Sequence, residues 1–222
     1  MPELIVTQKP IVSSNGRILT GLAARKAQLA SELGLPEELK PAQMEHRIGI
    51  VFDDSGSMRP DMIEDAHVGC EEFLRYCEPN KTAVCVYPMN ADVLSPSTNL
   101  PALAMLINGI RATGGTPLIQ KLSKMLRENK LTRAIVFSDG QPQSYTQAEY
   151  DFCVKSKIPV DTVFIGSGYG SEFMRKLASD CNGIFLQFER GKSNFRNSFK
   201  YLSPKLRWML ADKSFADKIQ GR

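Results

Sequence analysis

Apolar runs of strand length alternate along the chain with stretches in which apolar residues recur at helical spacing. The runs predict strands at residues 48–52, 82–87, 134–137, 160–165 and 184–188. The helical spacing predicts helices at 61–76, 100–110, from 118 onward, at 147–155 and at 171–179. A short partner strand is expected at 92–94, antiparallel and at an edge. Regular alternation of strands and helices predicts an α/β fold, with a mostly parallel sheet covered by helices on both faces.

Three segments are expected along the chain. Residues 46–190 hold the alternating pattern and should form the main domain. Residues 1–45 form an N-terminal extension that we expect to pack on this core, with helical spacing from Ile18 to Leu33 that ends at Gly34. Residues 191–222 form a basic C-terminal helical extension.

Bulk properties place the protein among soluble globular proteins. Its 222 residues are 42% hydrophobic, which is enough for a substantial core. The apolar runs are far shorter than the ~20 residues that cross a bilayer, and the N-terminus lacks the pattern of a signal peptide. The five cysteines have no C-x-x-C pair and read as reduced core thiols, so a cytoplasmic location is expected.

The clearest candidate for chemistry follows the strand at 48–52. There Asp53, Ser55 and Ser57 stand at positions i, i+2 and i+4 of a loop, so that three oxygens could converge on one cation. Hard oxygen ligands suit magnesium, calcium or manganese rather than zinc or copper. Taken alone, the stretch is equally consistent with turn formers and a helix N-terminus.

Two further segments extend this candidate site. The strand at 134–137 also stops at a carboxylate, Asp139, and Thr116 stands in Gly-Gly-Thr-Pro before the helix from 118. Thr116 is also expected to be the N-cap of that helix, with Pro117 at its first position. Because ligands of open parallel sheets bind at the carboxyl ends of the strands, the five residues should surround one point if the two strands are neighbours.

At these residues the chain resembles the von Willebrand factor A (VWA) domain family. The match consists of Asp53-x-Ser55-x-Ser57 after the first strand, Thr116 in Gly-Gly-Thr-Pro and Asp139 in Ser-Asp-Gly, in the family's order. The resemblance implies a Rossmann-like three-layer sandwich and an intact metal ion-dependent adhesion site. It also implies that Ser55, Ser57 and Thr116 approach the ion directly, and Asp53 and Asp139 directly or through water. Ser138 replaces the usual threonine of Thr-Asp-Gly.

The function that this resemblance implies is metal-dependent protein binding. A bound Mg²⁺, with Mn²⁺ or Ca²⁺ as alternatives, would take an oxygen from an Asp or Glu carboxylate of a partner protein. The chain would then be an intracellular adaptor or assembly subunit. Many intracellular relatives work beside AAA-type ATPases, so a complex of that class is an expected partner.

A metal-dependent hydrolase is the less favoured enzymatic alternative. It would need a general base near the ion. His46 lies seven residues before Asp53 in an extended segment, about 23 Å away at ~3.3 Å per residue. His67 lies beside the apolar stripe of a helix and reads as a packed or solvated side chain, and Asp54 is expected to point outward. We therefore expect no enzymatic activity.

The other alternative is nucleic-acid binding through the C-terminal tail. Residues 189–222 hold nine Lys or Arg against three Asp or Glu, interleaved with aromatic residues such as Trp208. Such a mixture could neutralise phosphates and stack bases, but an amphipathic packing helix is favoured. The glycines at 166–170 resemble a phosphate-binding loop without its spacing, and a strand-to-helix turn with Ser171 as cap is favoured there.

Overall fold

The computed structural model describes residues 44–188, except 59, 141, 167 and 169. The chain divides into two compact units, 1–37 and 38–222, and the described residues belong to the second. The predicted extension at 191–222 and all but the last two residues of the one at 1–45 lie outside the described residues. The predictions for the basic aromatic tail lie outside them too.

The described residues form a sheet in the strand order β3-β2-β1-β4-β5-β6. All neighbouring strands are parallel except β3, which pairs antiparallel with β2 at the edge. The strands are β1 (His46–Phe52), β2 (Thr82–Pro88), β3 (Leu94–Ser97), β4 (Arg133–Ser138), β5 (Val160–Ile165) and β6 (Phe185–Phe188). The predicted fold class is confirmed, although the edge strand begins at Leu94 rather than at residue 92.

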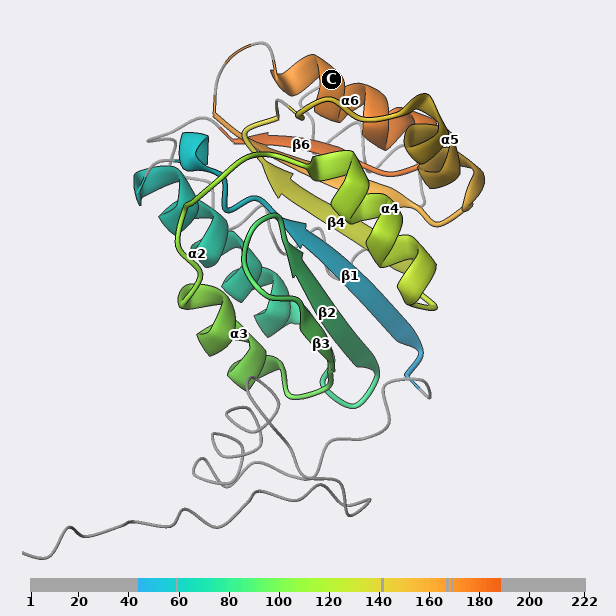
Figure 1. The fold of residues 1–222 in the computed structure, drawn as a ribbon. Helices are drawn as coiled ribbons and strands as arrows, with labels where there is room; N and C mark the ends of the chain where they lie inside the picture. The colour runs from blue at the N-terminus through green and yellow to red at the C-terminus, as the bar shows by residue number, and fades with distance from the viewer. Residues whose placement is uncertain (1–43, 59, 141, 167, 169, 189–222) are drawn as a thin grey trace, which may run out of the picture. The chain divides into compact units, whose positions relative to one another are not determined.

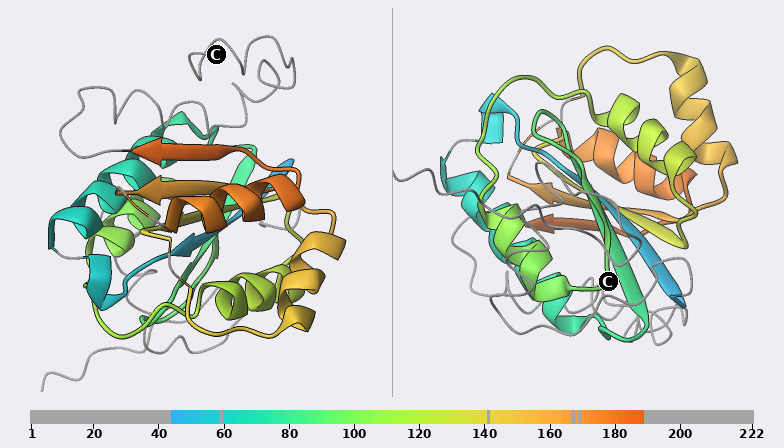
Figure 2. Two further views of the ribbon diagram at one scale, coloured as in Figure 1. Left: turned by 90° about the horizontal axis from the view of Figure 1, so that it is seen from above. Right: turned by 60° about the horizontal axis from the view of Figure 1, so that its bottom comes forward.

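Helices cover both faces of this sheet, as the alternating pattern predicts (Figures 1 and 2). Helices α2 (Pro60–Tyr76) and α3 (Leu100–Asn108) lie on one face. Helices α4 (Leu118–Glu128), α5 (Gln147–Lys155) and α6 (Gly170–Asp180) lie on the other. A short 3₁₀ turn, η2 (Gly56–Met58), leads from the loop after β1 into α2. The result is a three-layer α/β sandwich.

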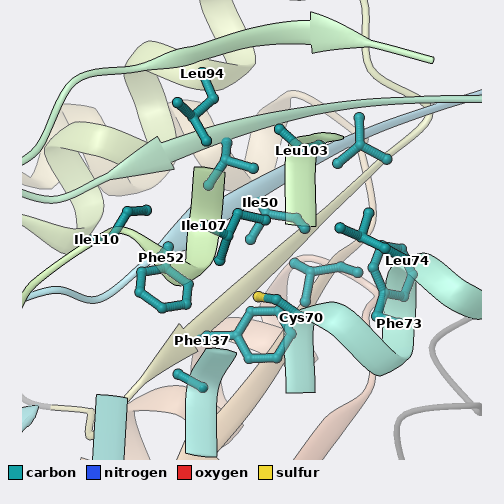
Figure 3. Close-up of a cluster of buried hydrophobic side chains, with 14 of the residues drawn as sticks. Ile50, Phe52, Cys70, Phe73, Leu74, Leu94, Leu103, Ile107, Ile110 and Phe137 are labelled. Atoms are coloured by element: carbon teal, nitrogen blue, oxygen red, sulfur yellow. The ribbon is translucent and has the colours of Figure 1, made fainter. Parts of the chain in front are cut away.

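Strand β1 contributes to the cores on both faces because its side chains alternate. Ile50 and Phe52 pack with Cys70 and Phe73 of α2 (Figure 3). Val51 packs into the opposite core with residues of α4. A Cβ atom at Gly49 would lie 2.6 Å from the sulfur of Met125, so this glycine permits close packing of α4 on β1. With helices on both sides, β1 reads in the sequence as a continuous apolar run.

Two predicted helix caps are wrong. Helix α4 begins at Leu118, with Pro117 as the N-cap and no capping hydrogen bond from a side chain. Thr116 instead belongs to the preceding loop, where its carbonyl oxygen accepts hydrogen bonds from the N–H groups of Leu118 and Gln143 at 2.8 and 2.9 Å. Helix α6 begins at Gly170, so Ser171 lies inside the helix rather than at its cap.

All five cysteines lie among the described residues, and all are buried and free. This confirms the prediction of reduced core thiols. In the part of the chain that the structure describes, no helix is long and apolar enough to span a membrane.

An ion pair between a buried carboxylate and a partly exposed guanidinium group links the amino-terminal ends of two strands. The guanidinium group of Arg133 donates two hydrogen bonds, of 2.8 and 2.7 Å, to the two carboxylate oxygens of Asp161. Asp161 is fully buried, and it also accepts a hydrogen bond from the N–H of Ile184 at 2.9 Å. The pair therefore ties β4 to β5 and to the segment that enters β6.

Replacement of Arg133 should destabilise the fold far from the candidate site. Arg133→Met removes the guanidinium that pairs with the buried Asp161 carboxylate, and we expect a loss of about 3–5 kcal/mol in the free energy of unfolding, measured by urea denaturation. Arg75→Met is the matched control, since the 64% exposed Arg75 pairs with Glu71 on the surface and should cost about 1 kcal/mol or less. Equal losses in the two variants would contradict the structural role of Arg133.

Candidate metal-binding site

The candidate site lies where the strand order reverses. Strand β1 has β2 on one side and β4 on the other, and both neighbours are parallel to it. The chain runs outward from β1 through β2 and β3, and then returns to place β4 on the opposite side of β1. In such sheets the crevice for ligands opens at this point, outside the carboxyl ends of the strands. Asp53 and Asp139 follow β1 and β4 there, so the two strands are neighbours as the prediction required.

The loop after β1 is attached to the end of β4. The N–H of Asp53 donates to the carbonyl oxygen of Phe137 at 2.9 Å. One carboxylate oxygen of Asp53 accepts from the N–H of Ser55 at 2.9 Å, and the other accepts from the hydroxyl of Ser138. The hydroxyl oxygens of Ser55 and Ser57 lie 3.0 Å apart. Asp53 and Ser55 are buried and Ser57 is exposed, so three of the five predicted residues converge in one loop that reaches the surface.

The loop that carries Thr116 runs beside this first loop. The N–H of Gly56 donates to the carbonyl oxygen of Gly114 at 3.1 Å, and the N–H of Thr113 donates to that of Asp54 at 2.5 Å. Gly114 has a φ of +68°, a conformation that glycine adopts without strain. Thr116 is 7% exposed, and its hydroxyl makes no hydrogen bond within the described residues.

Asp139 completes the predicted set from the β4 side. It is partly exposed at the end of the strand, and its carboxylate makes no hydrogen bond within the described residues. The neighbouring Ser138 hydroxyl donates to Asp53 and accepts from the N–H of Gly140 at 3.0 Å. Ser138 therefore links the loops that carry the two carboxylates.

The electrostatics of Asp53 are unfavourable for a charged group. Burial raises the pKa of Asp53 above its ordinary value, and the nearby charge of Asp139 raises it further. Hydrogen bonds from Ser138 and Ser55 oppose this shift but do not cancel it. A cation beside Asp53 would reverse the balance, because it would supply the positive charge that the described surroundings of this carboxylate lack.

The donor set fits a hard dication. The five predicted residues offer two carboxylates and three hydroxyls, which suits Mg²⁺, Mn²⁺ or Ca²⁺. Within the described residues there is no cluster of three or more Asp, Glu, His or Cys side chains that could hold a metal. A cation at this edge of the sheet would therefore depend on the hydroxyls of Ser55, Ser57 and Thr116 as well as on the carboxylates.

Neither histidine stands where a general base would be needed. His46 begins β1, at the end of the strand opposite Asp53, as expected. His67 is buried in α2 and stacks on Phe52 with ring centroids 5.4 Å apart. Burial and the nearby charge of Arg111 lower the pKa of His67. His67 was predicted to be either packed or solvated, and the structure shows that it is packed.

The prediction for Asp54 is wrong. Instead of pointing outward, its side chain is fully buried. Its carboxylate accepts hydrogen bonds from the N–H groups of Asn90 and Ala91, each at 2.8 Å, in the loop after β2. Those N–H groups were not recognisable as its partners, because they lie 36 and 37 residues away in the sequence.

Asn90 and Ser138 are two residues of the site region that sequence reasoning missed. Asn90 stands in a segment that reads as an ordinary turn after β2, and its contacts depend on strand order. For Ser138 a signal existed, since a hydroxyl residue directly precedes Asp139 in Ser-Asp-Gly. A hydroxyl at a strand end, beside a neighbouring strand that also ends in a carboxylate, is a natural hydrogen-bond donor to that carboxylate.

The fold defines the class of the protein as a doubly wound α/β sandwich. Within this class, the solved structures that it resembles include VWA domains. They include the von Willebrand factor type A protein from Catenulispora acidiphila, with 20% identity, a TM-score of 0.58, and coverage of 72% of this chain and 42% of that one. The vWF domain of the pili tip protein Mfa5 from Porphyromonas gingivalis has 11% identity and a TM-score of 0.59, and the match covers 72% of this chain and 94% of that one. The SpRpn10 VWA domain has 13% identity and a TM-score of 0.55, and the match covers 72% of this chain and 96% of that one.

These similarities show a shared fold and no more. Comparison of the sequence with models of protein families finds no match, and comparison with curated proteins finds none either. The chain spans less than half the length of the Catenulispora acidiphila protein.

The burial of Asp53 leads to a prediction for the metal-free protein. Because the fold raises the pKa of this acid, its ionised form opposes folding, and that cost is present above the raised pKa and disappears as the pH falls toward the ordinary value. Asp53→Asn should therefore raise the melting temperature in chelator at pH 7, and the increase should shrink at acidic pH.

Thermal melts of Asp53→Asn and of Asp92→Asn, at an exposed carboxylate in the β2–β3 loop, would check this prediction. The control should melt like the wild type. A lower melting temperature for Asp53→Asn at pH 7 would contradict the electrostatic account of Asp53.

Proposed function

We propose that this protein is a VWA domain that binds a partner protein through a divalent cation. The observation that supports the proposal is that the loop of Asp53, at the strand-order reversal, is bonded both to the end of β4 and to the loop that carries Thr116. The residues that would hold the ion are Asp53, Ser55, Ser57, Thr116 and Asp139. The ion would be Mg²⁺, with Mn²⁺ and Ca²⁺ as alternatives.

The donor set explains how such an ion would serve recognition. Three of the five donors are neutral hydroxyls, so the protein would not neutralise the ion completely. A dication held in this way stays attractive to one more anionic oxygen, and an Asp or Glu carboxylate of a partner protein supplies it. Binding would therefore need the cation and an acidic residue in the partner.

Binding rather than catalysis is the function that the surroundings of the site support. Asp54, the carboxylate next to Asp53, is committed to hydrogen bonds with Asn90 and Ala91. His67 is buried and stacks on Phe52 inside the core, so its ring is occupied by packing. Neither group is placed to take a proton from a cation-bound water, as a hydrolase would require.

The expected setting is that of an intracellular adaptor or assembly subunit. Five buried free thiols suit a reducing compartment such as the cytoplasm. A similar fold occurs in Mfa5, whose description as a pili tip protein suits an interaction role. An AAA-type ATPase complex remains the proposed partner class, on the strength of the sequence resemblance alone.

Calorimetric titration with Mg²⁺ tests the proposal directly. The wild type should show saturable binding, and Asp53→Ala and Thr116→Ala should each reduce the affinity at least tenfold because each removes a ligand. Acetate, as a mimic of the partner carboxylate, should bind the wild type in Mg²⁺ but not in chelator.

Asp92→Ala, which removes an exposed carboxylate outside the donor set, is the control and should titrate like the wild type. Circular dichroism should show that every variant is folded. If the wild type binds no Mg²⁺, or if the affinity is the same in Asp53→Ala, the proposed function is wrong.

A further inference from the structure

Consecutive carboxylates at the end of β1 face opposite neighbours in the sheet. Asp53 accepts from Ser138 at the end of β4, whereas Asp54 accepts from Asn90 and Ala91 after β2. The candidate cation site uses the first carboxylate. Asp54 is buried and bonds with Asn90 and Ala91 instead, which indicates a structural role separate from that of Asp53.

The side chain of Asn90 extends these contacts to the loop of Thr116. Its amide nitrogen lies 3.2 Å from the carboxylate of Asp54 and donates to the carbonyl oxygen of Gly115 at 2.9 Å. Its amide oxygen accepts from the N–H of Gly115 at 3.2 Å. Asn90 therefore pairs with Gly115 in both directions, as one peptide group pairs with another in a sheet, while Asp54 accepts hydrogen bonds from the backbone and side-chain N–H groups of Asn90.

The fit between Asn90 and this loop is close. A Cβ atom at Gly114 would lie 2.3 Å from the amide oxygen of Asn90, so no other residue could occupy this position without displacing the asparagine or the loop. The positive φ of Gly114 also favours glycine at this position, because residues with a side chain rarely adopt it. Thr116 directly follows Gly115, so the two bonds between Asn90 and Gly115 help to position it, beside the backbone bonds of Thr116 itself.

We propose that Asn90, anchored by Asp54, is a positioning residue that sets the Thr116 loop in place before a cation binds. The inference rests on the proposed function, because it concerns the same cation site. Asn90 itself lies outside the donor set, and it acts through the backbone of Gly115. Without it, the loop would be held only by backbone bonds, those of Gly56 and Thr113 to the Asp53 loop and that of Gln143 to Thr116. Thr116 would then sample positions away from the site, and cation binding would have to order the loop.

Hydrogen exchange in the metal-free full-length protein tests the positioning role. The informative amides are those of Gly56 and Thr113, which bond to the neighbouring loop without using the side chain of Asn90. In Asn90→Ala both should exchange at least tenfold faster than in the wild type, because the whole loop separates more often. Amides in the centre of β1 should be unchanged, which would exclude general loss of stability.

Calorimetric titration of the same variant with Mg²⁺ tests the consequence. The affinity of Asn90→Ala should fall about tenfold or more, the effect expected when a residue that orients a metal ligand is lost. Asn108→Ala is the matched control, since Asn108 is exposed at the end of α3 away from these contacts. Asn90→Ser, whose side chain is too short to pair with Gly115, provides a milder second variant if the alanine protein does not fold.

The outcomes separate this inference from the proposed function. Faster exchange together with weaker Mg²⁺ binding would support it. Unchanged exchange at Gly56 and Thr113, or unchanged affinity in Asn90→Ala, would overturn it while leaving the proposed function intact. A wild type that binds no Mg²⁺ would refute the proposed function and the positioning role with it.

Discussion

The central place of β1 between two parallel neighbours is the constraint on which the rest of the structure depends. Because all three strands run the same way, the loops that follow them emerge at one edge of the sheet. Two consecutive residues of the loop after β1 can then reach the loops on both sides. Asp53 bonds with the β4 side and Asp54 with the β2 side, so one short segment connects the carboxyl ends of three strands.

Buried carboxylates have different partners at the two ends of the parallel strands. At the amino-terminal edge, Asp161 is buried but is matched by the two hydrogen bonds of Arg133. At the carboxyl edge, Asp53 is buried with hydrogen-bond donors, no cationic side chain among the described residues pairs with it, and burial raises its pKa. Burial without a counter-charge opposes folding, and structural residues seldom keep it. The arrangement is therefore typical of a place that serves binding.

Most of the fold follows from local pattern, and the parts that do not depend on distant partners. The helix at Gln147–Lys155 and the strand at Val160–Ile165 have the predicted bounds, because apolar periodicity and a capping box at Thr146 define them locally. The edge strand was displaced by two residues, since an edge has a partner on one side only. That Asp53 and Asp139 follow neighbouring parallel strands was also predictable, because both apolar runs stop at carboxylates.

The orientation of Asp54 and the role of Asn90 were not predictable in the same way. Both depend on hydrogen bonds between loops that lie 25 to 37 residues apart in the sequence, and nothing local distinguishes Asn90 from an ordinary turn residue. In the sequence, Thr116 before Pro117 has the pattern of a helix N-cap. The prediction failed because the contacts with Asn90 and Gly56 fix the preceding glycines, and the helix then starts only at Leu118.

This displacement of the helix start has a consequence for the site. A threonine at an N-cap directs its hydroxyl to the N–H groups of its own helix, which would satisfy the oxygen locally. The hydroxyl of Thr116 does not cap α4, and within the described residues it makes no hydrogen bond. The hydroxyl of Thr116 is thus free of a capping bond to α4, and the contacts of the loop with Asn90, Asp54 and Gly56 help to set its position. A cation at this edge would meet a hydroxyl that the fold has placed and left available.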